Sequence, residues 1–386
     1  MTDDILRAVA AEYGTPTYVY DLDLVSARVA AVRGAFPGAE IRYAVKANAN
    51  GALLRHLADL GVGAEALTLG ELERALRAGF APERVVLGGP GHTAALAERA
   101  ARAGVGLVSL DSEGAWELWR AVDAPTTRFL VRLNPGFDPH THDHLATAAP
   151  ESKFGEPLPA ARRLARRVAA TGRLAGFHVH AGSMLADPAV AGLVVAALEP
   201  LHDEFPDLEY ADVGGGLAVP DPPLAQFAAA YRAFASRRGV RLMLEPGRLL
   251  VAEAGTLLTT VLHVKESARR HVIADAGMAD LLRPALYGAA HPVRSLAAAA
   301  PYRGPSTDVD GPLCENADRL ARDADLGEAR PGDLLAVGLA GAYGFAMASN
   351  YASSLRPAEV VVADGATRLA RRREVPEDLW RLEQDH

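Results

Sequence analysis

Residues 41–60 read IRYAVKANANGALLRHLADL, a short β-rich run followed by an amphipathic pattern. The run from Ile41 to Val45 has the length and composition of a buried strand. The leucines that follow, at positions 53, 54, 57 and 60, recur at the spacing of one helix face. A strand followed directly by a helix is the repeating unit of a parallel α/β fold.

The same strand–helix unit recurs along the next part of the chain. Seven further β-rich runs, separated by helical patterns, lie at residues 63–67, 84–88, 106–110, 128–133, 176–180, 210–213 and 242–244. Eight such units in about 210 residues predict a closed parallel (β/α)8 barrel, a TIM-like fold. We place this barrel at residues 25–255.

The pattern changes after the barrel. Strand-like runs at residues 256–264, 271–274, 334–337 and 359–362 are rich in β-branched residues and are separated by Gly and Pro. A similar run at 16–20 precedes the barrel and can join the same sheet, since chain termini often lie close together. We therefore predict a β-rich domain, a small barrel or sandwich, built from residues 1–24 and 256–386.

Composition excludes several classes of protein. Hydrophobic residues make up 49% and charged residues 23% of the chain, as in an ordinary globular protein. A net charge of -8 argues against nucleic acid as a partner. No apolar run reaches the roughly 20 residues that a membrane span needs. With one cysteine, no signal-peptide pattern and no multi-cysteine zinc pattern, we expect a cytoplasmic protein without a metal.

Barrel enzymes build their active sites at the carboxyl ends of the strands. The groups expected at these ends are Lys46, Glu65, His180 and Glu245, with the glycines Gly214, Gly215 and Gly216 after the seventh strand. Taken singly, a lysine in a loop is usually an exposed charge, and a glycine triplet often makes only a tight turn. Their joint placement at one mouth favours a catalytic site.

These groups suit a particular chemistry. A lysine amine can form a Schiff base with an aldehyde cofactor. Glycines after the seventh strand allow backbone N–H groups to approach a phosphate. A carboxylate beside a pyridine nitrogen keeps the nitrogen protonated, and a histidine can stack on the ring. The set points to pyridoxal 5′-phosphate (PLP) and to decarboxylation, which leaves a carbanion for the ring to delocalise.

Longer motifs occur in a fixed order along the chain. They are YAVKAN (43–48), NPG (134–136), ESKFG (151–155), HAGS (180–183), DVGGG (212–216), EPGR (245–248), DAGMADLLRPALY (275–287), GPLCE (311–315) and GAYGF (341–345). Together they resemble the fold-type III PLP-dependent decarboxylases and, within them, the diaminopimelate decarboxylase family. The resemblance covers residues 5–365, which is nearly the whole chain.

The resemblance implies a PLP-dependent carboxy-lyase that converts meso-diaminopimelate to L-lysine and CO2. Lys46 would bind the cofactor covalently, His180 would stack on its ring and Glu245 would pair with its pyridine nitrogen. The other implied cofactor contacts are Glu65, Ser183, Gly214, Gly215, Gly216 and Tyr343.

The family also implies a shared active site in a homodimer. Cys314 would donate a proton to the carbanion across the dimer interface, and Glu315 would bind the substrate amino group. The substrate's distal carboxylate would be held by Arg248, Arg283 and Tyr287, because a guanidinium fork suits a carboxylate.

Some positions differ from the family pattern. Glu65 stands where Asp is usual, Met184 where Gln is common and Asn316 where Ser is frequent, and the loops at 68–71 and 91–93 also differ. These differences keep open a decarboxylase of another amino acid, or of an aminoacyl group on a carrier protein. A racemase is disfavoured by the Cys314-Glu315 motif. A non-catalytic PLP-binding protein is disfavoured by the β-rich domain.

Overall fold

The computed structural model describes residues 1–137, 149, 151–297 and 300–384. Contacts divide the chain into two compact units. One comprises residues 26–249, and the other joins residues 1–25 to residues 250–386. Among the described residues, no helix combines the length and the apolar character that crossing a membrane requires.

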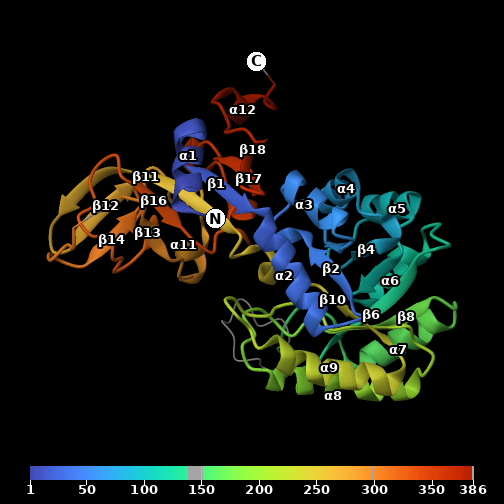
Figure 1. Cartoon of the computed structure of the whole chain (residues 1–386). Helices are drawn as coiled ribbons and strands as arrows, with labels where there is room; N and C mark the ends of the chain where they lie inside the picture. Colours follow the sequence, from blue (N-terminus) through green and yellow to red (C-terminus); the bar gives the residue numbers. More distant parts are fainter. Residues whose placement is uncertain (138–148, 150, 298–299, 385–386) are drawn as a thin grey trace. The chain divides into compact units, whose positions relative to one another are not determined.

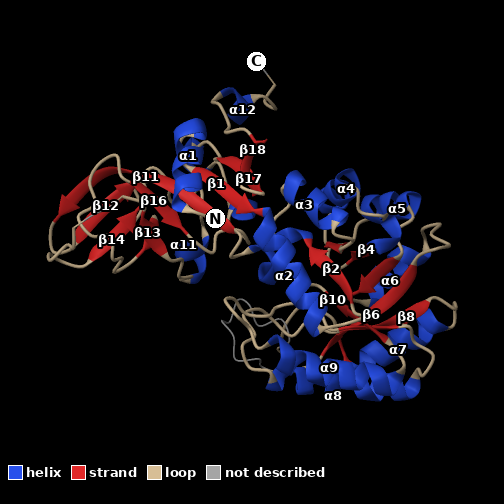
Figure 2. Ribbon diagram, viewed as in Figure 1, coloured by secondary structure: helices blue, strands red, loops and turns tan. Residues whose placement is uncertain are grey.

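The unit of residues 26–249 contains a closed barrel of eight parallel strands with helices around its outside (Figures 1 and 2). In order around the barrel, the strands are β2 (Glu40–Ala44), β3 (Gly63–Ala66), β4 (Val85–Leu87), β5 (Leu107–Leu110), β6 (Arg128–Asn134), β8 (Leu174–His178), β9 (Tyr210–Asp212) and β10 (Arg241–Leu244). Strand β10 pairs with β2 and closes the ring. All eight expected strands are present, with ends displaced by at most two residues, so the predicted barrel is confirmed.

The outer helices begin and end where local sequence signals place them. They include α2 (Leu22–Ala35), α3 (Gly51–Asp59), α4 (Leu69–Ala78), α5 (Ala94–Ala103), α6 (Glu113–Arg120), α7 (Leu158–Ala169), α8 (Ala189–Glu204) and α9 (Leu224–Arg238). Thr68, Thr93 and Ser112 cap α4, α5 and α6 by accepting a backbone N–H in the first turn. Gly79 and Gly104 end α4 and α5 in the left-handed conformation.

Side chains that point inward from the strands fill the barrel. One buried cluster takes a residue from each of six strands: Val86, Leu107, Leu130, Ala175, Tyr210 and Met243. The barrel is therefore a packed core, and its chemistry is confined to the loops at its carboxyl end. A two-residue strand, β7 (Glu156–Pro157), extends the sheet beside β6.

The other unit is built around a mixed sheet. Its strands are β1 (Thr17–Asp21), β11 (Gly255–Glu266), β12 (Arg270–Ala274), β13 (Val293–Ser295), β14 (Thr307–Asp310), β15 (Arg319–Ala321), β16 (Leu334–Val337), β17 (Ala358–Ala363) and β18 (Ala366–Arg371). As expected, the run near residue 16 enters this sheet: β1 lies antiparallel to β11 and parallel to β17. The helices of the unit are α1 (Asp3–Tyr13), α10 (Arg248–Val251, which starts at the unit boundary), α11 (Arg283–Tyr287) and α12 (Glu377–Trp380).

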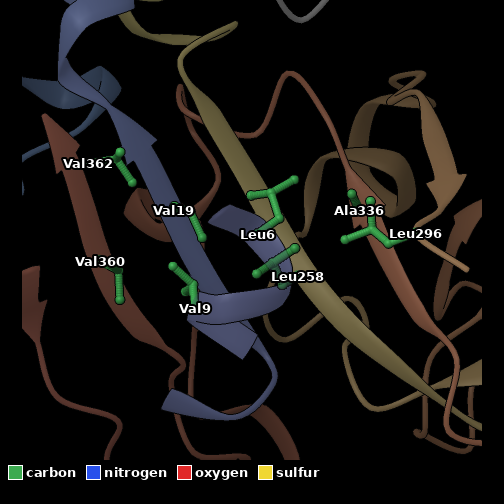
Figure 3. Packing of buried hydrophobic residues seen from close by; sticks show 8 residues of the cluster. All are labelled: Leu6, Val9, Val19, Leu258, Leu296, Ala336, Val360 and Val362. Carbon is green, nitrogen blue, oxygen red and sulfur yellow. The ribbon is translucent and has the colours of Figure 1, made fainter. Parts of the chain in front are cut away.

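Helix α1 covers the central strands of this sheet. Leu6 and Val9 of α1 pack with Val19 of β1, Leu258 of β11 and Val360 of β17 (Figure 3). All five side chains are at most 1% exposed. Full burial of an aliphatic side chain contributes about 1.5–3 kcal/mol, so this cluster ties the N-terminal segment to the C-terminal sheet.

His202, in the last turn of α8, is a buried polar residue among apolar side chains. Its side chain is 3% exposed, and its ring packs against those of Phe177 and Phe234, with centroids 5.8 and 5.0 Å away. Among the described residues, neither ring nitrogen has a hydrogen-bond partner. Burial, followed by the nearby Arg238, lowers the pKa of His202 from 6.5 to about 4.

Replacing His202 with leucine is expected to stabilise the barrel and to weaken its sensitivity to acid. Because the folded pKa lies below the unfolded one, the unfolded state binds more protons between pH 6.5 and 4, and stability falls as pH decreases. Between pH 7 and pH 5 this histidine contributes a loss of about 2 kcal/mol, which leucine removes. The free energy of unfolding of both proteins, measured in urea at pH 7 and at pH 5, tests this prediction. The control is leucine at the exposed His263, which should lose as much stability between pH 7 and pH 5 as the wild-type protein. If the His202 variant loses as much stability as the wild-type protein, His202 is not the source of the acid sensitivity.

Candidate active site

Lys46 lies just beyond the end of β2, in a single 3-10 turn formed by residues Val45–Ala47. The hydroxyl of Tyr43 anchors this turn by donating to the carbonyl of Asn48 at 3.0 Å. Lys46 Nζ is 3.4 Å from Glu65 Oε2 at the neighbouring end of β3. Glu65 is almost fully buried whereas Lys46 is one-third exposed, so the amine reaches the barrel mouth with a carboxylate beneath it.

His180 follows β8 by two residues, because the strand ends at His178 and not at His180 as expected. The backbone N–H of Gly215 donates to His180 Nδ1 at 3.2 Å. That bond makes Nδ1 the acceptor, so the neutral ring carries its proton on Nε2. Burial first, and then the Lys46 and Arg132 cations, hold the pKa of His180 well below its usual value. The imidazole is therefore neutral at physiological pH.

The loop after β9 has no room for side chains. A Cβ at Gly214 would lie 2.8 Å from His180 Nδ1, and one at Gly215 or Gly216 would collide with the carbonyl oxygen of Glu245 or Gly182. Gly214 and Gly216 also have φ angles of +66° and +88°, in the left-handed region that favours glycine. The loop presents bare backbone at the barrel mouth, a form that suits an anion.

Glu245 follows β10 and is 6% exposed. Its Oε2 lies 3.5 Å from His178 Nε2, and its Oε1 accepts no hydrogen bond from the described residues. Burial, together with the neighbouring Asp212 and Glu65 carboxylates, raises the pKa of Glu245 well above its usual range. Burial likewise raises the pKa of Asp212 to about 7. A buried carboxylate in such surroundings needs either a proton or a cationic partner.

Arg248 and Ser183 extend the site on the side of the glycine loop. Arg248 Nη2 is 3.5 Å from Ser183 Oγ, and both side chains are half-buried. Arg248 and Gly214–Gly216 also line one small pocket. At Gly247 a Cβ would lie 3.0 Å from Ala47 Cβ, so glycine there allows the EPGR turn to approach the lysine turn closely.

The remaining expected residues lie in the β-rich unit. The guanidinium carbon of the buried Arg283 is 5.6 Å from the ring centroid of Tyr287 and 5.7 Å from that of Tyr343, so these three side chains form one cluster. Cys314 and Glu315 lie on an exposed loop. There Tyr351 donates a hydrogen bond to Glu315.

The structure also brings in residues that the sequence analysis did not single out. His178, whose Nδ1 is 2.8 Å from Ser109 Oγ, and Asp212 lie beneath Glu245. Arg132 pairs with Asp111 at 3.3 Å, and both are buried. His178, Asp212 and Arg132 lie in the last three residues of their strands, and Asp111 directly follows β5. All four share one sequence signal, a polar or charged residue near the end of a strand, but a strand buried on both faces does not show which of its residues point inward.

The barrel residues fit a bound PLP. The unpartnered Glu245 Oε1 offers an acceptor for a protonated ring nitrogen, and neutral His180 offers a flat ring. The N–H groups of Gly214 and Gly215 donate to Asp212 and His180, so the candidate donors for a phosphate are the N–H of Gly216 and the Ser183 hydroxyl. Lys46 offers an amine at the mouth. The described part of the barrel therefore contains every kind of group that binding this cofactor requires.

Comparison with known proteins gives consistent matches. A family described as "Pyridoxal-dependent decarboxylase, pyridoxal binding domain" matches residues 22–252. The chain is 41% identical to diaminopimelate decarboxylase of Deinococcus radiodurans, over 98% of each chain. It is 36% identical to that of Aquifex aeolicus, over 96% of this chain and 91% of the relative. Crystalline diaminopimelate decarboxylase from Helicobacter pylori complexed with L-lysine superposes with a TM-score of 0.91 at 35% identity, over 98% of this chain and 99% of that one.

Proposed function

Because the chain belongs to the pyridoxal-dependent decarboxylases, and among them to the diaminopimelate decarboxylase family, we propose that it converts meso-diaminopimelate to L-lysine and CO2. Its cofactor is PLP. The relative from Helicobacter pylori is described as a complex with L-lysine, which is the product of this reaction.

The observation that carries the proposal is Glu245. A carboxylate buried in a barrel, with one oxygen that accepts no hydrogen bond from the described residues, is unfavourable unless a cation reaches it. A protonated pyridine nitrogen is such a cation, and pairing with it lowers the pKa of Glu245 back toward its usual range. The neighbouring Asp212 and neutral His178 provide no positive charge of their own at neutral pH.

When bound, PLP supplies an aldehyde that reacts with amines and a ring that accepts the electron pair released as CO2 leaves. Lys46 provides the amine that attaches the cofactor, and Glu65 beneath it favours the protonated amine. His180, in its neutral form, would stack on the ring. The glycine loop, Ser183 and Tyr343 would hold the phosphate, and Ser183 lies 3.5 Å from the guanidinium of Arg248.

The β-rich unit supplies the groups that bind the substrate and end the reaction. Arg283, which lies near the rings of Tyr287 and Tyr343, would bind the distal carboxylate together with Tyr287. Glu315 of the same unit would bind the substrate amino group, and Arg248 of the barrel unit would also bind the distal carboxylate. The Cys314 thiol donates the proton to the carbon that has lost CO2. A homodimer that shares its active sites, and a location in the cytoplasm, stay predictions.

Release of CO2 and L-lysine from meso-diaminopimelate by the PLP-loaded protein is the expected result. LL-diaminopimelate is the control for stereochemistry, because it carries the same charges as the meso isomer in a different arrangement. Enzymes typically turn over about 1 to 10³ times per second. Absence of turnover in a protein that has bound PLP covalently contradicts the choice of substrate and leaves the reaction class in place.

One observation supports a second candidate. Met184 follows Ser183 directly, is 39% exposed and has a φ of +61°, so an exposed apolar side chain stands next to a residue of the candidate site. This favours a substrate without a polar group at that point, such as another amino acid or an aminoacyl group on a carrier protein. CO2 release from a panel of amino acids, but not from meso-diaminopimelate, would select it.

A further inference from the structure

The loop that carries Cys314 and Glu315 is unusually long for its position. Residues 311–318 connect β14 to β15, which are antiparallel neighbours. Connections between such strands commonly have two to about five residues. The residues from Pro312 to Ala317 are exposed or half-buried, whereas Asp318 is 2% exposed. A reactive side chain on an exposed loop keeps a fixed position only if the loop is anchored from inside.

Asp318 provides that anchor through both of its carboxylate oxygens. Oδ1 accepts the backbone N–H of Met278 at 2.5 Å, and Oδ2 accepts the backbone N–H of Leu313 at 2.6 Å. The backbone of Asp318 also closes the loop, since its carbonyl accepts from Gly311 at 2.8 Å and its N–H donates to Glu315 at 3.0 Å. One buried side chain thus joins the Cys314 loop to the turn at residues 277–278.

Two glycines make room for this carboxylate. A Cβ built on Gly277 or on Gly311 would collide with Asp318 Oδ1. Neither glycine has a φ in the left-handed region, so backbone conformation does not require glycine at either position. Space for the Asp318 carboxylate is what excludes a side chain there.

We propose that Asp318 is a positioning residue that holds the Cys314-Glu315 loop against the turn preceding Arg283 and Tyr287. The proposal rests on the proposed function for the roles of these four residues. It requires both oxygens to act as acceptors, because both partners are backbone N–H donors. An amide at this position can offer only one acceptor and places its NH2 group against the other N–H.

The test uses D318N, with E359Q as the matched control. Glu359 is a buried acid of the same unit that accepts from Tyr20 and Arg371 and does not contact the loop. Cys314 is the only cysteine in the chain, so its rate of alkylation by iodoacetamide reports the loop's position without turnover. For D318N we expect kcat/KM for meso-diaminopimelate to fall about 10²-fold. We also expect alkylation to quicken at least about threefold as the loop loosens, and E359Q to alkylate at the wild-type rate.

A residue that only stabilised the unit would lower the fraction of folded protein without changing the alkylation rate of Cys314 in the folded fraction. An unchanged alkylation rate in folded D318N therefore overturns the proposal, whatever happens to turnover. If D318N does not fold, G277A disturbs the same carboxylate from the opposite side and keeps its charge, and the same acceleration is expected. Failure of wild-type turnover would count against the proposed substrate alone, since the alkylation measurement needs no substrate.

Discussion

Replacing Lys46 with alanine is expected to lower kcat by about 10³-fold or more, because the variant has no amine at the barrel mouth to attach the cofactor or to move protons. The fold is expected to persist, since the side chain is 35% exposed and its contact with Glu65 is a single ion pair at 3.4 Å. Borohydride reduction followed by peptide mapping measures the attachment directly. The wild-type protein is expected to carry reduced cofactor on the peptide that contains Lys46.

The chain offers a clear control for this experiment. It has only three lysines, Lys46, Lys153 and Lys265, so peptide assignments are unambiguous. Lys265 is exposed on β11, and its replacement by alanine should leave both attachment and turnover unchanged. Cofactor found on another lysine in wild-type protein, or full activity in the Lys46 variant, would remove Lys46 from the mechanism.

Replacing Glu245 with glutamine is expected to lower kcat about 10²- to 10³-fold while the cofactor stays attached to Lys46. A neutral amide is nearly the same size but no longer favours a protonated ring nitrogen, so the ring accepts electrons less well. Removing one preorganised electrostatic group from an active site typically has an effect of this size. Single-turnover kinetics, with cofactor content measured in parallel, separates lost chemistry from lost binding.

Glu40 is the matched acid for this variant. It begins β2 at the opposite end of the barrel and pairs there with Arg42 and Arg241. Glu40→Gln is expected to change stability and to leave kcat near the wild-type value. Equal losses in the two variants, or none in Glu245→Gln, would mean that Glu245 is not the partner of the ring nitrogen.

The barrel could be predicted because its strands are local signals. Each expected run is short, apolar and bounded by a helical pattern, and burial on both faces makes such runs nearly continuous in hydrophobicity. Besides the two-residue β7, the strands β13, β14, β15 and β18 were missed. Three of them have only three or four residues, and β18 is largely exposed, so none carries a strong apolar pattern.

The candidate site was predicted only in part. Lys46, Glu65 and Glu245 were found from their places at strand ends, which need no knowledge of contacts. His178 and Asp212 were missed because a parallel strand that is buried on both faces shows no alternation, so its sequence does not reveal which residues point inward. Asp318 was missed because both of its partners are backbone N–H groups, one of them 40 residues away.

By itself, the sequence determined the alternation of strands and helices, the kinds of reactive group and the positions where only glycine fits. These properties depend on residues that are close to one another in the sequence. Only the tertiary structure decided which groups meet and in which protonation state. Closure of the barrel by β10 and β2 brings Glu245 and Lys46 to one mouth. Burial then makes His180 neutral and leaves Glu245 in need of a cation, because the cost of a charge depends on the water removed around it.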